Sequence, residues 1–342
     1  MFEPCVVPGQ GEDPAADVLL AEITAWVRSE PLRALVRRFG DGSPSGELPD
    51  ELGYLDEFTA AAWNFRKTDA ADPKERNQVD PDAISGADEE LAIAAADALG
   101  LVRPRPPKYQ HYNHLVVLGG LVRANVWRPA YAAHLLRNGV TADHIAGITG
   151  YRDLARNKDH PERDEYELLK VFGLPGRAYE WQVMEDGLRR AFNLPEFTVE
   201  LESSPDAEGS ARFRVARAES AGRPVSLVVA PALEPGQRAN TADGYRYWAE
   251  QVGHVKPGDR VLAVTTCIYV PYQHAVALQL LGLPFGCSID TVGIDFGEVD
   301  DTLSPQEFRG AHYLLEVRSA LRAYRQLVRM LLDGAGLRQA TG

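Results

Sequence analysis

Small and polar residues gather at four positions where buried strands are predicted to end. The first is Gly119-Gly120, which follows the apolar run 115–118 and precedes Arg123 and Arg128. Two glycines after a strand let the backbone approach a bound group closely, and arginines near the start of a helix can hold an anion. This segment therefore predicts an anion-binding loop, although it matches neither the G-x-G-x-x-G nor the P-loop pattern.

The second position is Thr149-Gly150, at the end of a predicted strand over 145–149, with Arg152 just beyond it. No acidic residue follows this strand directly, whereas nicotinamide-dinucleotide sites of the Rossmann kind place one there to hold ribose hydroxyls. That absence argues against such dehydrogenases and against the common methyltransferases. We expect Thr149 and Gly150 to line a ligand site. Arg152 is either a further ligand contact or a surface ion pair with Asp153.

The third position is Asn240-Thr241, which opens a predicted helix and could either contact a ligand or cap that helix. The fourth is the polar run at the end of the apolar strand 261–266, and it supplies Thr265, Thr266, Tyr269, Tyr272 and His274. A polar run directly after an apolar strand is the strongest local indication of a site in this sequence. We expect Thr266 and Tyr269 to face the reacting group, with Tyr269 as proton donor or orienting group.

In the same run, Tyr272 is a third candidate catalytic residue, and Thr265 and His274 are candidate ligand contacts. Metal binding is not expected. His111 and His114 have a metal-like spacing, but alternation along the strand they enter would send them to different faces of the sheet. The sequence contains no nucleophile elbow, H-E-x-x-H or C-x-x-C motif.

The charge balance limits the partners that this chain could bind. Its 342 residues include 36 Lys and Arg against 49 Asp and Glu, a net charge of −13, and residues 1–110 hold 21 of the acidic and 11 of the basic residues. A surface of this sign repels phosphate backbones, so neither nucleic acid nor an anionic membrane is expected as a partner. Three scattered cysteines and the absence of a signal peptide or an apolar span predict a cytoplasmic location.

Two patterns describe the elements that must position these residues. Residues 1–105 show helical spacing of apolar residues and predict a helical appendage, with helices within 17–39, 51–66 and 87–99. From residue 106 to 342, buried strands alternate with amphipathic helices, which is typical of a mostly parallel sheet covered by helices on both faces. Residues 185–224 interrupt this alternation of strands and helices, and they predict a β-hairpin insertion. The predicted fold class is therefore α/β and Rossmann-like.

In their order and spacing, these strand ends resemble the YdcF/SanA/ElyC family of bacterial proteins. The family pattern runs from a glycine cluster through an arginine-led helix, a strand ending near Ser-Gly, a Glu-containing helix and an Asn-Thr pair to a Val-Thr-Ser strand end and a late Tyr-Leu-x-Glu helix. The matching residues here are Val117-Leu118-Gly119-Gly120, Arg128, Thr149-Gly150, Glu165 or Glu167 before Gly173-Leu174-Pro175, Asn240-Thr241, Val264-Thr265-Thr266 and Tyr313-Leu314-Leu315-Glu316. Tyr269 and Tyr272 stand where the family has His-x-x-Arg.

The resemblance covers about residues 113–325 and implies a Rossmann-like fold. One member of that family is associated with S-adenosylmethionine, so this cofactor is a possible ligand, and other members are associated with envelope biogenesis. Those envelope members are membrane-anchored, whereas this chain lacks a span and carries the helical region 1–105 instead. The resemblance thus implies a divergent relative without a membrane anchor.

These observations support two functions. The first is a cytoplasmic enzyme of group transfer or hydrolysis that binds a nucleotide-like or other anionic small molecule at the strand ends. The second is a non-catalytic sensor or binding protein whose acidic region 1–105 contacts a protein partner or a second copy of the chain. The loss of the family's His-x-x-Arg pair favours the second. A methyltransferase using S-adenosylmethionine is a third, weaker alternative, because no acidic residue follows the second strand.

Overall fold

The chain forms two compact units. The structure is a computed structural model, and it describes residues 2–10, 15–40, 42, 45–66, 78–204, 206–207, 209–234, 236–237, 239–299 and 306–340. The first unit comprises Met1–Arg103, Cys267–Gln279 and Glu307–Gly342, and the second comprises Pro104–Thr266 and Leu280–Gln306. The first unit therefore contains the predicted appendage together with two segments from the end of the chain.

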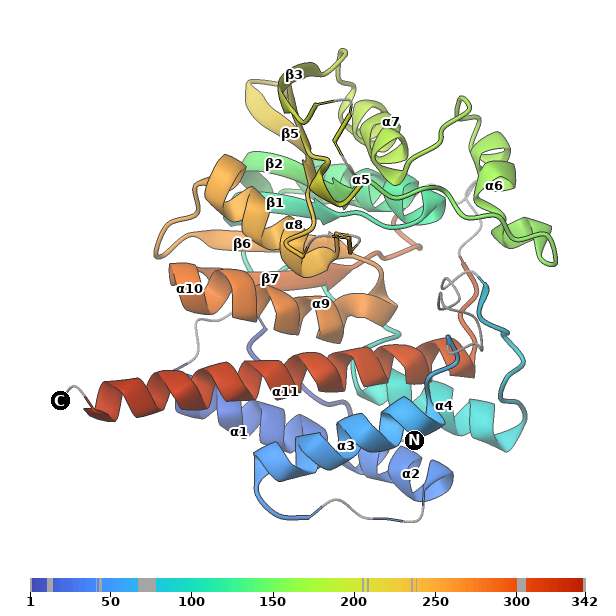
Figure 1. Ribbon diagram of the computed structural model, residues 1–342, viewed down its shortest axis with the longest axis vertical. Coiled ribbons are helices and arrows are strands. Elements are labelled where there is room, and N and C mark those ends of the chain that lie inside the picture. Colours follow the sequence, from blue (N-terminus) through green and yellow to red (C-terminus); the bar gives the residue numbers. More distant parts are fainter. Residues whose placement is uncertain are drawn as a thin grey trace. The chain divides into compact units, whose positions relative to one another are not determined.

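The first unit is helical in its described residues (Figure 1). Its helices are α1 (Ala16–Val27), α2 (Glu30–Phe39), α3 (Leu48–Ala62), α4 (Ala87–Ala98), α9 (Val270–Ala277) and α11 (Gly310–Ala340). The long helix α11 packs against α3, α4 and α9. Trp26 of α1 and Tyr324 of α11 are both buried, with ring centroids 5.0 Å apart. The unit's core is thus built between its amino-terminal helices and α11.

The second unit is built on a seven-stranded sheet in the order β3-β4-β5-β2-β1-β6-β7. The strands are β1 (His111–Leu118), β2 (Thr141–Gly150), β3 (Thr198–Glu202), β4 (Arg214–Ser220), β5 (Arg223–Ala230), β6 (Arg260–Thr265) and β7 (Ser288–Gly293). The five strands β1, β2, β5, β6 and β7 run parallel. The chain first builds outward from β1 through β2 to β5, then returns to the other side of β1 with β6 and β7. This is the Rossmann strand order, and it reverses between β1 and β6.

Helices cover both faces of this sheet (Figure 1). The unit's helices are α5 (Val122–Arg137), α6 (Glu165–Val171), α7 (Glu180–Phe192), α8 (Thr241–Trp248) and the short α10 (Leu283–Phe285), and α5, α7 and α8 pack on the strands. A Cβ on Gly147 of β2 would meet Leu188 of α7 at 2.7 Å, and a Cβ on Gly244 of α8 would meet Ile148 of β2 at 2.7 Å. Because successive residues of a strand face opposite sides, α7 and α8 lie on opposite faces of the sheet. These findings confirm the predicted α/β class.

The predicted hairpin insertion is part of the sheet. Strands β3 and β4 pair antiparallel, and β4 also pairs antiparallel with β5, from Arg214 opposite Val229 to Ser220 opposite Arg223. The two-residue turn between β4 and β5 has positive φ at Ala221 (50°) and Gly222 (78°). Such a turn matches the twist of a hairpin, so the insertion adds strands β3 and β4 to one edge of the sheet.

Within the described ranges, no helix is long and apolar enough to cross a membrane.

Candidate functional site

Arg128 links two strand ends where the strand order reverses. Its side chain rises from α5 and is only 2% exposed. The guanidinium donates from Nη1 to the carbonyl oxygens of Leu118 and Gly119, both at 2.7 Å, after β1. Its Nε and Nη2 lie 3.3 and 3.2 Å from Oγ1 of Thr266, just after β6. The sequence placed Arg128 and Thr266 in a ligand site, and the structure joins the two residues directly.

The glycine loop after β1 is held by the protein's own groups. The Gly119 N–H donates to the Ile148 carbonyl at 2.7 Å, and the Gly120 N–H donates to Oδ1 of Asn125 at 3.0 Å. Asn125 also donates back to the Gly120 carbonyl at 2.8 Å. A Cβ on Gly119 would lie 2.7 Å from the Ile148 carbonyl oxygen, so only glycine fits between the ends of β1 and β2.

Thr149 has a buried hydroxyl beside this loop. The residue is 8% exposed, and its Oγ1 has no hydrogen-bond partner among the described residues. That oxygen lies 2.9 Å from the position a Cβ on Gly119 would occupy, so it faces the glycine loop. Buried hydroxyls in native proteins are nearly always hydrogen-bonded. Thr149 is therefore the predicted site residue whose polar group is most in need of a partner.

The amino terminus of α5 already carries a carboxyl group. Glu165 is 1% exposed, and its Oε2 accepts a hydrogen bond from the Val122 N–H at 2.5 Å. Burial raises the pKa of Glu165 to about 8; the Val122 N–H opposes this rise and the nearby Glu180 adds to it. A helix amino terminus after a glycine loop is where this fold commonly binds phosphate. Glu165 occupies that place here.

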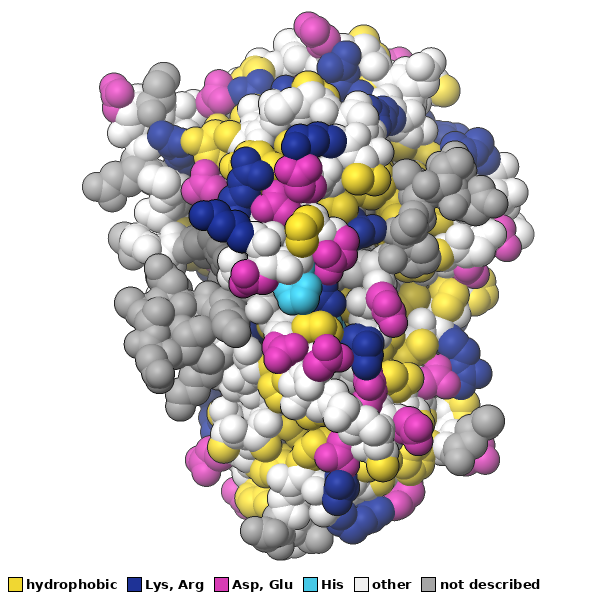
Figure 2. All heavy atoms as spheres, turned by 90° about the vertical axis from the view of Figure 1, so that its right-hand side faces the viewer, with side chains coloured by type: hydrophobic (Ala, Val, Ile, Leu, Met, Phe, Trp, Pro, Cys, Tyr) yellow, Lys and Arg dark blue, Asp and Glu magenta, His cyan; other side chains and the backbone are white. Residues whose placement is uncertain are grey.

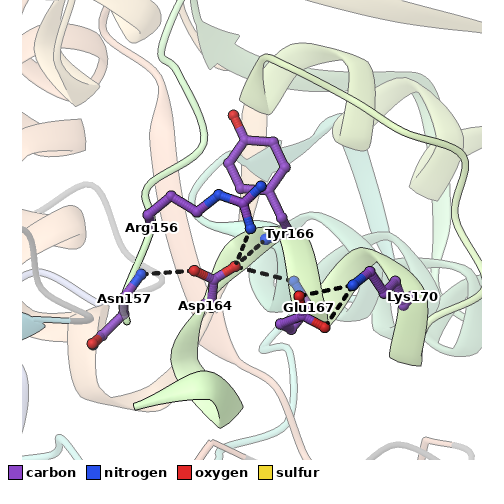
Figure 3. A network of polar contacts seen from close by, with 6 residues as sticks. All are labelled: Arg156, Asn157, Asp164, Tyr166, Glu167 and Lys170. Atoms are coloured by element: carbon purple, nitrogen blue, oxygen red, sulfur yellow. Dashed lines mark hydrogen bonds and ion pairs between the residues drawn. The ribbon is translucent and has the colours of Figure 1, made fainter. Parts of the chain in front are cut away.

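A helix cap directly precedes Glu165, and Figure 3 shows its polar contacts. Asp164 caps α6, and its Oδ1 accepts from the Tyr166 N–H at 3.0 Å. Its Oδ2 accepts from the Asn157 N–H at 2.8 Å, and Arg156 pairs with the same carboxylate at 3.2 Å. Although burial alone would raise the pKa of Asp164, hydrogen bonds from backbone N–H groups lower it overall. The capped turn thereby fixes the backbone from which Glu165 reaches α5.

Two further predicted arginines lie in this region. Arg123 donates from Nη2 to the Glu162 carbonyl at 3.1 Å, and burial lowers its pKa. Arg152 pairs with the buried carboxylate of Glu180 at 2.9 Å. On the face drawn in Figure 2, Lys and Arg side chains lie beside Asp and Glu side chains.

The third predicted position has a structural role. Asn240 is exposed and caps α8, accepting from the N–H groups of Ala242 at 2.7 Å and Asp243 at 3.3 Å. Thr241 is the first residue of that helix. The preceding residue, Ala239, would lie 3.5 Å from a Cβ on Gly150, so the turn before α8 adjoins the end of β2. The capping alternative for Asn240 is thus present in the structure.

The fourth predicted position divides between the two units. Thr265 and Thr266 belong to the second unit, and Thr265 is fully buried in the sheet. Tyr269, Tyr272 and His274 belong to the first unit, where the Tyr269 ring packs edge-on against Phe308 with centroids 6.4 Å apart. The strand-end residues that the structure brings together are therefore Gly119, Gly120, Arg128, Thr149 and Thr266, with Gly150 adjoining them.

Sequence reasoning missed two of the residues that organise this region. Asn125 bonds both backbone groups of Gly120 and also donates to the Glu180 carbonyl at 3.0 Å. Glu165 was noted only as one of two candidates for a family motif. Asn125 is an amide residue next to the apolar Ala124, Val126 and Trp127, and a polar residue in such a stretch is a sign of a buried hydrogen-bonding role. No comparable local signal marked Glu165.

Comparisons with known proteins identify similar chains. A family model described as the Rv3785 N-terminal domain matches residues 10–100. The uncharacterized proteins Rv3785 of Mycobacterium tuberculosis strain H37Rv and Mb3814 of Mycobacterium bovis are each 28% identical over 358 residues. The match covers 98% of this chain and 96% of each relative. No solved structure matches the chain.

These comparisons correct the predicted family. The chain is similar to Rv3785 along nearly its whole length, including the region 1–105 that the YdcF/SanA/ElyC pattern left unexplained, so the predicted membership of that family is wrong. The physical reason is that glycines, hydroxyls and arginines at strand ends are common to Rossmann-like sheets in general. Their order described the fold and carried no information on the family.

Proposed function

We propose that the second unit binds a small anionic, nucleotide-like molecule beyond the carboxyl ends of β1, β2 and β6. The observation that carries this proposal is the buried hydroxyl of Thr149, which faces the glycine loop without a hydrogen-bond partner among the described residues. Sheets of this topology bind ligands at the carboxyl ends of their strands, where the strand order reverses. A polar ligand atom there would complete the hydrogen bonding of Thr149.

The charges near this position favour an anion. Arg123 and Arg128 lie in the first two turns of α5 and Arg152 lies in the loop after β2, in a chain whose net charge is −13. The raised pKa of Glu165, about 8, keeps its carboxyl group mostly protonated at neutral pH. Because Glu180 balances Arg152, the positive charge that would attract an anion here is that of Arg123 and Arg128. Phosphates and carboxylates are the groups that such arginines bind best.

Catalysis by group transfer or hydrolysis is the second candidate, and Glu165 is the observation that favours it. A buried carboxyl group with a pKa near neutrality can give and take a proton at physiological pH. This proposal does not use Tyr269 or Tyr272, which belong to the other unit. A cytoplasmic location is part of the proposal, and the free thiols of Cys5, Cys267 and Cys287 are in keeping with it.

Thr149→Val tests the proposal, because valine has the shape of threonine and lacks the hydroxyl. Freshly purified protein is examined by native mass spectrometry for a retained ligand and then by thermal shift with nucleotides, S-adenosylmethionine and phosphorylated metabolites. A true ligand at about 100 times its Kd stabilises the wild type by roughly 2.7 kcal/mol. The variant should lose most of that shift while folding normally.

Thr141→Val is the matched control, since Thr141 begins the same strand and is exposed at its opposite end. It should respond to ligand like the wild type. If no compound shifts the wild type and no ligand is retained, or if Thr149→Val binds as well as the wild type, the proposed site is wrong.

A further inference from the structure

Three aromatic side chains meet just beyond the end of β2. Tyr151 lies edge-on to Tyr179, with centroids 5.7 Å apart and planes at 74°, and to Trp181, at 5.9 Å and 64°. The start of α7 is tied to the end of β2 by the Glu180 N–H, which donates to the Arg152 carbonyl at 2.9 Å. All three rings are half-buried. We refer to Tyr151, Tyr179 and Trp181 as the aromatic cluster.

Two arginines lie over rings of this cluster. The guanidinium of Arg212 is 5.6 Å from the centroid of Tyr151, and that of Arg214 is 4.8 Å from the centroid of Trp181. Arg212 is also held by the Ala207 carbonyl, to which its Nε donates at 3.2 Å. Rings and guanidinium planes that alternate in this way form a surface on which a flat π-system can stack.

Buried polar atoms that need a partner belong to residues in and beside this cluster. Nε1 of Trp181 and Nε of Arg214 are buried and have no hydrogen-bond partner within the described part of the chain, and the same holds for Oγ1 of Thr149. Thr149 lies two residues before Tyr151, which contacts Trp181, which in turn contacts Arg214. Trp181 and Arg214 thus belong to one series of contacting side chains that starts at Tyr151, and Thr149 stands two residues before Tyr151 in the chain. In a native protein such atoms are normally satisfied, by water or a ligand where protein groups are absent.

We propose that this surface binds the nucleobase of the ligand, stacked on Tyr151 beneath Arg212. The inference rests on the proposed function, because it takes Thr149 to contact the same ligand. A ring held between Tyr151 and Arg212 needs two van der Waals separations, roughly 7 Å in all, so the 5.6 Å spacing has to open by little more than 1 Å. Trp181 Nε1 and Arg214 Nε are both donors, so the edge of the base must present acceptors, as the carbonyl of guanine does.

The test compares two ligands that carry the same anion. Guanosine 5′-monophosphate and ribose 5-phosphate are titrated into the full chain by calorimetry. The nucleotide should bind at least tenfold more tightly, since stacking and base-edge contacts are available to it alone. Tyr151→Leu should remove about that tenfold advantage and leave the affinity for ribose 5-phosphate unchanged. Trp181→Phe keeps the ring and removes the donor, so it should cost the nucleotide severalfold.

Tyr109→Leu is the matched control, because Arg260 lies 4.3 Å over the Tyr109 ring in the same unit, before the start of β1. It should bind both compounds like the wild type. Equal affinities for the two compounds, or a Tyr151→Leu effect of the same size on both, would overturn the base-binding site.

Guanosine without phosphate separates the two proposals. If no anionic compound binds but guanosine binds in a way that depends on Tyr151, the proposed anion site is wrong and the base-binding surface stands. If ribose 5-phosphate binds through Thr149 but guanosine and the nucleotide gain nothing from Tyr151, the proposed function stands and this inference is wrong. If none of the three compounds binds, both are wrong.

Discussion

Arg128 and Thr266 are hydrogen-bonded across the point where the strand order of the sheet reverses. Both Nε and Nη2 of Arg128 lie within 3.3 Å of Oγ1 of Thr266, and Nη1 reaches the two carbonyls at the end of β1. The guanidinium therefore fixes β1 and β6 relative to each other at their carboxyl ends. A ligand site at this position starts from strand ends that are already held in place, which lowers the entropy lost on binding.

Removing this guanidinium should destabilise the protein strongly. Arg128→Met leaves the carbonyls of Leu118 and Gly119 and the hydroxyl of Thr266 without their buried donor. Because each buried acceptor left without its donor costs about 1–3 kcal/mol, we expect a loss of about 3 kcal/mol or more in the free energy of unfolding, measured by urea denaturation. Arg128→Lys keeps the charge but not the planar fork, so its loss should be smaller.

Arg246→Met provides the comparison, because Arg246 is exposed and pairs with Glu250, one helical turn away. Such a surface pair contributes about 0.3–0.5 kcal/mol. Equal losses at Arg128 and Arg246 would show that Arg128 does not hold the strand ends.

Glu165 should make the stability of the protein depend on pH near neutrality. Its folded pKa is raised to about 8, above that of a glutamate in the unfolded chain, so the folded state binds the proton more tightly. This contribution is complete below about pH 4.3 and is lost as the pH rises toward 8. Relative to Glu165→Gln, which cannot titrate, the wild type should lose up to about 1.4 kcal/mol per pH unit in that window.

Urea denaturation of both proteins at pH 5, 6, 7 and 8 measures this difference. Glutamine can still accept the hydrogen bond from Val122, so the variant should fold. Glu167→Gln is the control in the same helix, because the Glu167 side chain is 44% exposed. A constant difference between wild type and Glu165→Gln from pH 5 to 8 would contradict the raised pKa.

Tyr112 anchors the start of β1 to β7, and its hydroxyl should matter for stability. The ring is fully buried, and the hydroxyl donates to Oδ2 of the buried Asp290 at 2.5 Å while accepting from the Tyr109 N–H at 2.9 Å. Tyr112→Phe takes a donor from a buried carboxylate. We expect a loss of about 1.5–3 kcal/mol in the free energy of unfolding.

The same change at Tyr54, whose side chain is exposed, should cost far less. Thermal and urea unfolding of the two phenylalanine variants, measured in parallel, compare their losses in the free energy of unfolding. A Tyr112→Phe protein as stable as the Tyr54→Phe protein would mean that the hydroxyl contributes nothing.

The sheet could be predicted from the sequence because its central strands are apolar on both faces. The runs around Leu115, Ile145, Val225 and Val261 all became parallel strands. The strand ends then follow from register, since Leu118 of β1 lies opposite Ile148 of β2. This is why Gly119 and Thr149 were expected in one place and are found in contact.

The rest of the site depends on packing that local patterns do not encode. Glu165 reaches the start of α5 through the irregular segment after β2, whose path is fixed by the Asp164 cap and by pairing with residues near Tyr179. Tyr269 follows a sheet strand in sequence, yet its helix packs in the first unit. Neither outcome has a periodic signal in the sequence.

Helix α5 begins before the residue that was matched to the start of a helix. Arg128 was matched to an arginine-led helix, whereas α5 begins at Val122 and continues through Pro129. A proline at this position leaves the Asn125 carbonyl without its helical donor. In the structure Gly187 of α7 lies against that carbonyl, where a Cβ would be only 1.9 Å from the oxygen. The proline is accommodated where a second helix packs closely.

Gly187→Ala should therefore destabilise the protein, against the usual preference of helices for alanine. Gly187 lies inside α7, where alanine would ordinarily add up to about 1 kcal/mol of stability. Here the new methyl group would meet the Asn125 backbone and the Pro129 ring, at 1.9 and 3.2 Å, so α7 must move away from α5. We expect a net loss of about 1–3 kcal/mol, as for other overpacked cores.

Gly53→Ala is the matched control, because Gly53 lies inside α3 with only the end of Arg325 within 4 Å. That variant should gain stability in the same urea titration, so the two alanines should have opposite signs. A stabilising Gly187→Ala would mean that α5 and α7 are not packed at this distance.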